Sequence, residues 1–243
     1  MDLYGDTTAD FDAIKIKNAL HGFTNPNARY KKKFTEADIL KSPMVADPLK
    51  LLHITATSDG GAAMIVSSLD YAKRMGKGDA VRIAAISTVT PTFASGNVEM
   101  PDIATNSAAA AGVNPISYRS TIAGKAYEEA GIGPEDVSLA EVYDLSSALE
   151  MDWMEDLGLC EPGTAAQLVR AGDTTVGGRL PINPSGGLSC FGEAVPAQAI
   201  AQVCELTWQM RGTAGDRQVE GAKVGITANQ GLFGHGSSVI VKR

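Results

Sequence analysis

The chain has 243 residues, of which 44% are apolar and 20% charged, with a formal net charge of −7. These values are ordinary for a globular protein long enough to bury a core. The acidic balance and the lack of a basic stripe predict no nucleic-acid partner. No apolar run approaches bilayer length and the start resembles no signal peptide, so we expect a cytoplasmic protein without membrane contact.

The three cysteines are Cys160, Cys190 and Cys204. Their odd number and their spacing favour neither a disulfide framework nor a zinc site, so we expect a reducing compartment and no metal.

The first part of the chain predicts three helices and one strand. Residues 6–22 have a helical apolar stripe behind a cap at Asp6 or Thr7. A short helix follows Thr35 and stops before Pro43. The "DGG" turn predicts a strand over Ala62–Ser67, and "LDYAKRMG" predicts a helix.

The second part alternates strands with helices. The expected strands are 80–91, 137–144 and a pair within 222–243 around a turn from Gly231 to Gly236. The expected helices are 117–132, 146–159 and a long one from about 191 to 212, with Pro196 tolerated in its first turn. This order predicts a layered α/β architecture.

Tyr143 and Asp144 follow a predicted strand, and strand ends are where α/β proteins gather their sites. The alternative is that Tyr143 is an interfacial aromatic and that Asp144 caps the helix beginning near Ser146. The pattern slightly favours this alternative.

The stretch "NPSGGLSCFGEAVP" combines two glycines, a cysteine and a glutamate. Gly186 and Gly187 permit a left-handed turn or close backbone approach to a ligand. Glu193 is expected at the N-terminus of the long helix, where the helix dipole favours an anion. A solvated first-turn glutamate fits the pattern equally well. Cys190 is interpreted as a packing residue rather than a nucleophile.

The glycine-rich turn "NQGLFGHGS" is a candidate oxyanion-binding element, because its backbone N–H groups can point at a substrate oxygen. Asn229, Gly234 and His235 are its candidate residues. A plain hairpin with a surface histidine is the alternative. The basic cluster "RYKKKF" (29–34) fits a solvated loop, or an anion-binding patch for a phosphorylated cofactor.

Three stretches together resemble the C-terminal half of sterol-carrier-protein-type thiolases: "YDLSSALEMDWMEDLGLCEPG", "INPSGGL" and "ELTWQMRGTAGDRQVEGAKVGITANQGLFG". The earlier stretch "NPNARYKKKFTEADILKSPMVADPLKLLHITATSDGGAAMIV" resembles the middle of the same family. The resemblance implies a thiolase-like αβαβα fold, usually dimeric. Residues 1–75 would then end the loop region and N-terminal domain, and residues 80–243 would form the C-terminal domain.

Two departures accompany this resemblance. The stretch that carries the nucleophilic cysteine in the family would precede Met1. Active thiolases also have a His-Asp-Cys-Phe motif where this chain has "YDLS", and Gly-His-Pro where it has Gly192-Glu193-Ala194. Tyr143 and Glu193 thus replace two histidines.

These replacements resemble the lipid-transfer-protein branch, whose members are thiolase-like aldolases of steroid side-chain degradation that work with a DUF35 (OB-fold) partner. That branch has a tyrosine at the position of Tyr143. A second tyrosine would be expected at the position of Glu193, where this chain departs from the branch. The resemblance implies retro-aldol cleavage of a branched 3-hydroxyacyl-CoA by Tyr143, Glu193 and His235. Asp144, Gly186, Gly187, Asn229 and Gly234 would contact substrate or oxyanion. Coenzyme A would enter only as part of the substrate, without another cofactor. A thiolase with its cysteine elsewhere and a non-catalytic acyl-CoA-binding subunit remain alternatives.

Overall fold

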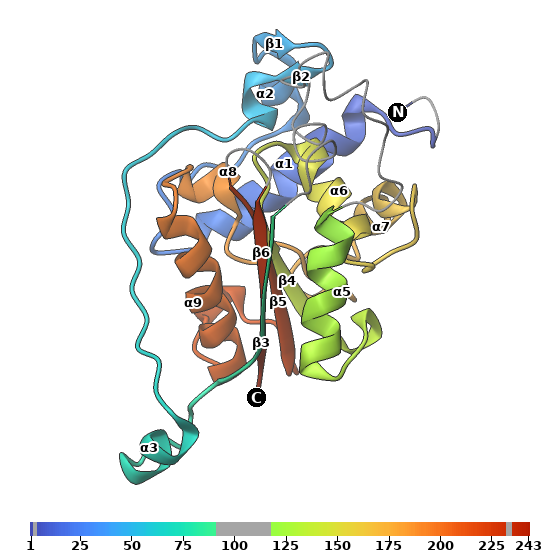
Figure 1. Cartoon of the computed structure of the whole chain (residues 1–243). Helices are drawn as coiled ribbons and strands as arrows, with labels where there is room; N and C mark the ends of the chain where they lie inside the picture. The colour runs from blue at the N-terminus through green and yellow to red at the C-terminus, as the bar shows by residue number, and fades with distance from the viewer. Residues whose placement is uncertain (2–3, 91–117, 232–234) are drawn as a thin grey trace.

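A mixed four-stranded sheet is the centre of the computed structural model, which describes residues 1, 4–90, 118–231 and 235–243 (Figure 1). The strands are β3 (Arg82–Val89), β4 (Leu139–Val142), β5 (Val224–Gln230) and β6 (Gly236–Lys242). Their spatial order is β3-β6-β5-β4. β6 runs antiparallel to both β3 and β5, and β4 runs parallel to β5.

One long helix covers each face of this sheet (Figure 1). The helix α9 (Ala197–Arg211) packs Leu206 and Met210 against Leu139 of β4. The helix α5 (Tyr118–Ala130) lies in the opposite core with the next strand residue, Ala140. Because neighbouring strand residues face opposite sides, odd positions of β4 face α9 and even positions face α5.

Four further helices gather near the end of the sheet where β4 and β5 finish (Figure 1). They are α1 (Thr8–Phe23), α6 (Ser147–Asp156), α7 (Ala165–Ala171) and α8 (Leu188–Phe191). Their buried side chains, including Ile14 and Trp153, join the α5 core. These helices therefore connect residues far apart in the sequence around the end of β4.

The remaining described elements are smaller. They are α2 (Glu36–Leu40), β1 (Met44–Ala46), β2 (Leu49–Lys50), η1 (Leu51–His53), α3 (Leu69–Arg74), η2 (Pro134–Asp136) and η3 (Gly215–Arg217). None of the helices in the described ranges is long and apolar enough to cross a bilayer.

Two sequence expectations about secondary structure were wrong. Residues 62–67 form no strand, and the side chain of Ile65 is fully exposed, because no described strand lies beside them. The long helix expected from residue 191 begins only at Ala197 as α9, after the cap Pro196, and Phe191 instead ends the short helix α8. The layered arrangement of helices on a sheet agrees with the predicted α/β class.

Candidate functional site

The structure brings Tyr143 and Glu193 together at the end of β4. Tyr143 is the first residue after β4, and its buried hydroxyl donates a hydrogen bond to Oε1 of Glu193. Glu193 is held through its backbone, because its N–H donates to Ala56 O at 2.8 Å and its carbonyl accepts from Ser58 N at 2.9 Å. The segment 56–58 therefore fixes the carboxylate beside the tyrosine.

The expected position of Glu193 at a helix N-terminus was wrong. Gly192 ends α8 with a φ of +80°, a conformation that favours glycine, and α9 does not start until Ala197. Glu193 lies in the loop between the two helices and forms an isolated parallel bridge with Thr57. Its position comes from this bridge and not from a helix dipole.

Burial raises the pKa of Tyr143 above its ordinary value, and the adjacent Glu193 carboxylate raises this pKa further. Both causes disfavour a tyrosinate, since it would be poorly solvated and would face another negative charge. Tyr143 is therefore a hydrogen-bond donor at neutral pH. In this pair Glu193 is the group that can accept a proton.

Asp144 is buried under α8 and does not cap α6. Its Oδ1 accepts the N–H of Leu188 at 2.6 Å, and its Oδ2 accepts from Asn18 Nδ2 at 3.2 Å. The cap of α6 is Ser146, whose Oγ accepts the N–H of Leu149 at 3.3 Å. Burial and the nearby Glu150 raise the pKa of Asp144 to about 8.

Gly186 and Gly187 allow α8 to approach α1 and Asp144 closely. A Cβ on Gly186 would lie 2.6 Å from Gly22 Cα, and one on Gly187 would lie 2.4 Å from Asp144 Oδ2. The N–H of Gly187 donates to Ser185 Oγ at 3.1 Å. This explains the two glycines by packing, and their contact with a substrate stays a prediction.

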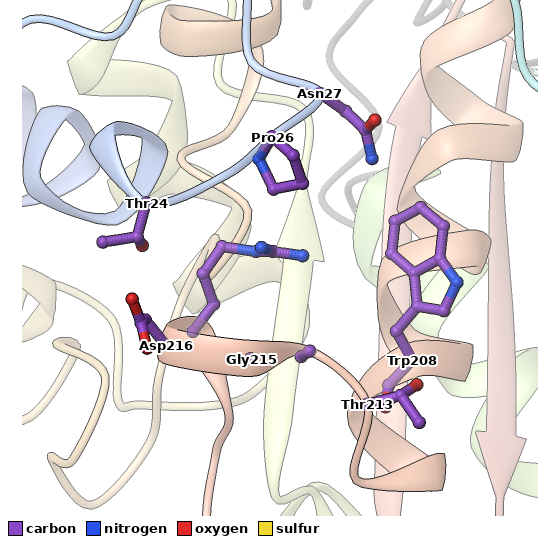
Figure 2. Close-up of a pocket in the computed structure, with 9 residues that line it drawn as sticks. Thr24, Pro26, Asn27, Trp208, Thr213, Gly215 and Asp216 are labelled. Carbon is purple, nitrogen blue, oxygen red and sulfur yellow. Dashed lines mark hydrogen bonds between the residues drawn. The ribbon is translucent and has the colours of Figure 1, made fainter.

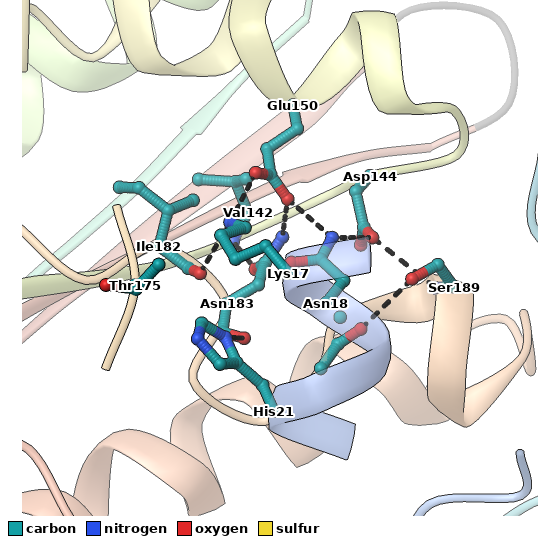
Figure 3. Close-up of polar contacts among 12 residues, drawn as sticks. Lys17, Asn18, His21, Val142, Asp144, Glu150, Thr175, Ile182, Asn183 and Ser189 are labelled. Carbon is teal, nitrogen blue, oxygen red and sulfur yellow. Dashed lines mark hydrogen bonds and ion pairs between the residues drawn. The ribbon is translucent and has the colours of Figure 1, made fainter. Parts of the chain in front are cut away.

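A buried polar network close to the Tyr143–Glu193 pair connects α1 to α6 (Figure 3). Glu150 accepts from Lys17 Nζ at 2.6 Å, from Asn18 Nδ2 at 2.7 Å and from Asn183 Nδ2 at 2.8 Å. Asn183 Oδ1 in turn accepts the N–H of Val142, the last residue of β4. The network therefore fixes the backbone directly before Tyr143.

His21 belongs to the same network and is neutral. Its Nε2 accepts the N–H of Val176 at 3.0 Å, so its Nδ1 is the nitrogen that donates to Asn183 O. Burial and the nearby Lys17 lower its pKa to about 3. Sequence reasoning missed this network, although Lys17, Asn18 and His21 recur at helical spacing beside apolar residues, which is a usable signal.

Of the three candidate oxyanion residues, the structure describes Asn229 and His235. Asn229 is buried, and its Nδ2 donates to Oε1 of Gln202 on α9. His235 is exposed, and its carbonyl accepts the N–H of Gly231 at 2.6 Å. Gly234 lies outside the described residues. The roles of all three toward an oxyanion stay predictions.

The buried cysteine near this site is not poised as a nucleophile. Sγ of Cys190 donates to Asn18 O at 3.2 Å, and burial raises its pKa to about 11. A thiol with a raised pKa carries little thiolate at neutral pH. Among the described residues, no three His, Cys, Asp or Glu side chains are grouped as a metal site requires.

A surface depression of about 490 Å³ is lined by residues of the loop after α1, of α9 and of the turn around η3, and not by Tyr143 or Glu193 (Figure 2). Thr24, Asn27 and Trp208 are among its lining residues, and the buried Arg217 beside them forms an ion pair with Glu205 at 2.9 Å.

In the neighbouring basic cluster, the Arg29 guanidinium donates to Thr57 O at 2.6 Å. The arginine thus supports the loop that holds Glu193. The anion-binding alternative for the cluster stays a prediction.

Comparison with solved structures confirms the fold. The structure of the "Ltp2-ChsH2(DUF35) aldolase" matches with a TM-score of 0.81 at 24% identity, over 100% of this chain and 60% of that one. A monomeric SCP2-thiolase-like protein type 1 from Mycobacterium smegmatis matches with a TM-score of 0.62 at 17% identity, over 98% of this chain and 48% of that one. At these identities the likeness concerns the fold.

Curated relatives match almost the whole chain. Sterol carrier protein 2 of Rattus norvegicus is 40% identical over 96% of this chain, and the match covers 41% of that protein. An acetyl-CoA acetyltransferase of Methanothermobacter thermautotrophicus is 36% identical over 97% of this chain, and 58% of that protein is covered. The chain thus spans about two fifths to three fifths of these relatives. Residues 97–243 match the family described as "Thiolase C-terminal domain-like", and the chain belongs to that family.

Proposed function

We propose that the chain acts as a carbon–carbon lyase on a branched 3-hydroxyacyl-CoA, releasing a ketone and a short acyl-CoA. The observation that carries this proposal is the hydrogen bond between the buried Tyr143 hydroxyl and the Glu193 carboxylate. A retro-aldol cleavage requires one proton acceptor and one hydrogen-bond donor but no covalent nucleophile. This pair supplies both groups.

In this mechanism Glu193 takes the proton of the 3-hydroxyl group. The oxygen then forms the ketone, the bond between carbons 2 and 3 breaks, and its electron pair enters the thioester as an enolate. Tyr143 donates a hydrogen bond to the developing negative oxygen, and Glu193 returns the proton to carbon 2, which gives the short acyl-CoA. The raised pKa of Tyr143 suits this donor role. His235 is proposed as a further contact to the oxyanion, and Asn229 as a contact to the substrate.

The cysteines argue against a thiolytic reaction that uses this chain's own thiols. Cys190 and Cys160 are both free, and burial raises the pKa of each to about 11. Cys204 is also free, and burial raises its pKa as well. Thiolysis would therefore need a cysteine from elsewhere, and the acetyltransferase relative keeps this second candidate open.

The proposal includes the assembly and its location. We propose a homodimer in the cytoplasm, with coenzyme A present only as part of the substrate. One fold neighbour, the Ltp2 aldolase, is named together with ChsH2(DUF35), and we propose a DUF35-type partner for this protein as well.

The test incubates the chain, alone and with a DUF35-type partner, with two substrates in separate reactions. The first is a branched 3-hydroxyacyl-CoA without free CoA, and the second is a 3-ketoacyl-CoA with free CoA. Mass spectrometry then follows the short acyl-CoA. The proposal predicts its release from the hydroxy substrate. Release from the keto substrate alone would establish thiolysis, and no release from either would leave acyl-CoA binding as the function.

A further inference from the structure

The buried face of α9 carries a line of polar side chains toward the sheet. At its far end Glu205 and Gln209 are fully engaged by the protein. The carboxylate of Glu205 pairs with Arg217 at 2.9 Å. The amide of Gln209 donates to Arg217 O at 2.8 Å and accepts the N–H of Val219 at 2.7 Å. Such full pairing is the rule for buried polar groups.

At the other end of this line, near the start of α9, the buried amides are not fully paired. Gln198, Gln202 and Asn229 are 5%, 1% and 8% exposed. Asn229 Nδ2 donates to Gln202 Oε1, but Gln198 Oε1, Gln202 Nε2 and Asn229 Oδ1 have no partner within the described part of the chain. A buried polar atom without a partner costs about 1–3 kcal/mol, so three such atoms on Asn229 and on one face of α9 require an explanation.

These three amides, here called the amide cluster, adjoin the tyrosine–glutamate pair. Val142 of β4 pairs with Ala228 of the parallel strand β5, so Tyr143 and Asn229 each come directly after a paired strand residue at this end of the sheet. Gln198 lies one turn beyond Glu193, and its N–H donates to Ala194 O at 3.2 Å. Gln202 follows at the i+4 position of the same helix face.

The chemistry of the amide cluster favours a neutral hydroxyl group as its ligand. The unpartnered atoms comprise one amide nitrogen and two amide oxygens in the described structure, so the cluster can both donate and accept. Turning an amide exchanges its oxygen and nitrogen but keeps both kinds of group available. An alcohol matches this set because it also donates and accepts, whereas a carboxylate or phosphate only accepts.

We propose that Gln198, Gln202 and Asn229 form a subsite that binds the alcohol hydroxyl of the acyl chain and so selects hydroxylated acyl thioesters. This inference rests on the proposed function, since it assumes an acyl-CoA ligand beside Tyr143. Sites whose buried polar groups await a substrate hydroxyl reject the analogue that lacks it, because those groups then stay unpaired. The amide cluster would therefore determine specificity, while the tyrosine–glutamate pair performs the chemistry.

The test measures binding to the whole chain by calorimetry with two CoA thioethers, S-(3-hydroxyalkyl)-CoA and S-alkyl-CoA of equal chain length. Neither can be cleaved, because neither has a thioester carbonyl. The wild type should bind the hydroxylated thioether about tenfold more tightly. Gln198→Met and Gln202→Met should each remove most of that preference and leave affinity for the plain thioether unchanged. Gln198→Met should also retain the wild-type melting temperature.

Gln209→Met is the matched control, because it removes an engaged amide from the same helix. Gln209→Met should lower the melting temperature but keep the preference for the hydroxylated thioether. If this variant does not fold, Gln218→Met serves as the control, because Gln218 is partly buried and its amide is also engaged. The subsite is overturned if Gln198→Met and Gln202→Met both keep the preference for the hydroxylated thioether, or if the wild type shows no such preference. This holds even if the chain cleaves the 3-hydroxyacyl-CoA. A preference without cleavage supports the subsite and contradicts the proposed reaction. Failure of both thioethers to bind overturns both proposals.

Discussion

At the scale of single residues, the surroundings of a side chain decide its protonation state. His21 is buried and keeps its two ring nitrogens bonded to Val176 N and Asn183 O, an arrangement that only the neutral ring satisfies. A protonated ring would also face Lys17. Protonation of His21 therefore opposes the network that positions β4.

This arrangement predicts a specific acid sensitivity. The folded-state pKa of about 3 lies below the ordinary value of 6.5, so between these values the unfolded chain binds a proton that the folded chain does not. The free energy of unfolding should fall as pH drops through that window, by a few kcal/mol in total. His21→Gln should be less stable at neutral pH but should show a shallower fall. Urea unfolding at several pH values measures this.

The exposed His235 provides the control for this experiment. His235→Gln should retain the wild-type slope, because that ring is accessible to water in the folded state. Equal slopes for wild type and His21→Gln would contradict the assignment of His21 as a buried neutral histidine.

The sequence identifies the candidate site residues, but it does not predict which of them are in contact. Tyr143 and Glu193 are named by the strand end, the glycine stretch and the family resemblance. Their contact depends on the bridge between Glu193 and Thr57, which joins positions 136 residues apart (193 − 57). No local pattern encodes such a pairing. The partner of Asp144 was missed for the same reason, since Asn18 lies on a distant helix.

At the scale of elements, the short helix α8 depends on its two glycines. Gly187 has a φ of +63°, and its Cα faces the Asp144 carboxylate. Both the backbone conformation and the space exclude a larger side chain there. The glycine pair indicated either a left-handed turn or a close backbone approach to a ligand, but not that Asp144 requires the space.

Gly187→Ala should destabilise the protein by about 2–4 kcal/mol, because about 1 kcal/mol of conformational strain adds to a clash with Asp144. Gly172→Ala measures the conformational strain alone, since Gly172 has a similar φ of +77° and nothing lies within 4 Å of the added Cβ. Thermal unfolding of both variants gives the difference. If the two substitutions cost the same, Asp144 does not pack against Gly187 as described.

Helix boundaries show the limits of local propensity at this scale. Thr35 was predicted as a cap and does accept the N–H of Asp38 at 3.3 Å. The long helix α9 was predicted six residues early, because Gly192 and Pro196 permit the loop that the bridge to Thr57 requires. Tertiary pairing here overrides a helical pattern.

At the scale of the whole molecule, the apolar segment 64–66 is largely exposed in the described structure. The side chains of Met64, Ile65 and Val66 are 46%, 100% and 63% exposed. The sequence pattern predicted a strand there, and an extended apolar segment without a neighbouring strand is a site for association. The family resemblance assigns this segment to the N-terminal domain, and that assignment stays a prediction.

We expect the chain on its own to associate with increasing concentration through this segment. Ile65→Lys should lower the association constant about tenfold or more, since it replaces a fully exposed apolar side chain with a charge. Sedimentation velocity over a range of concentrations measures the effect. Ser67→Lys is the control, because it adds the same charge to the segment without removing an apolar group. Equal effects of the two substitutions would attribute the change to charge alone.

The central claim concerns Tyr143, and single-turnover release of short acyl-CoA from the branched 3-hydroxyacyl-CoA tests it most directly. Tyr143→Phe should slow release about 10²–10⁴-fold, because it removes the donor of the proposed pair. Tyr127→Phe is the matched control: that hydroxyl is also buried but donates to Leu157 O at 2.8 Å in the α5 core, so the rate should stay within about threefold. Wild-type release by Tyr143→Phe would contradict the account.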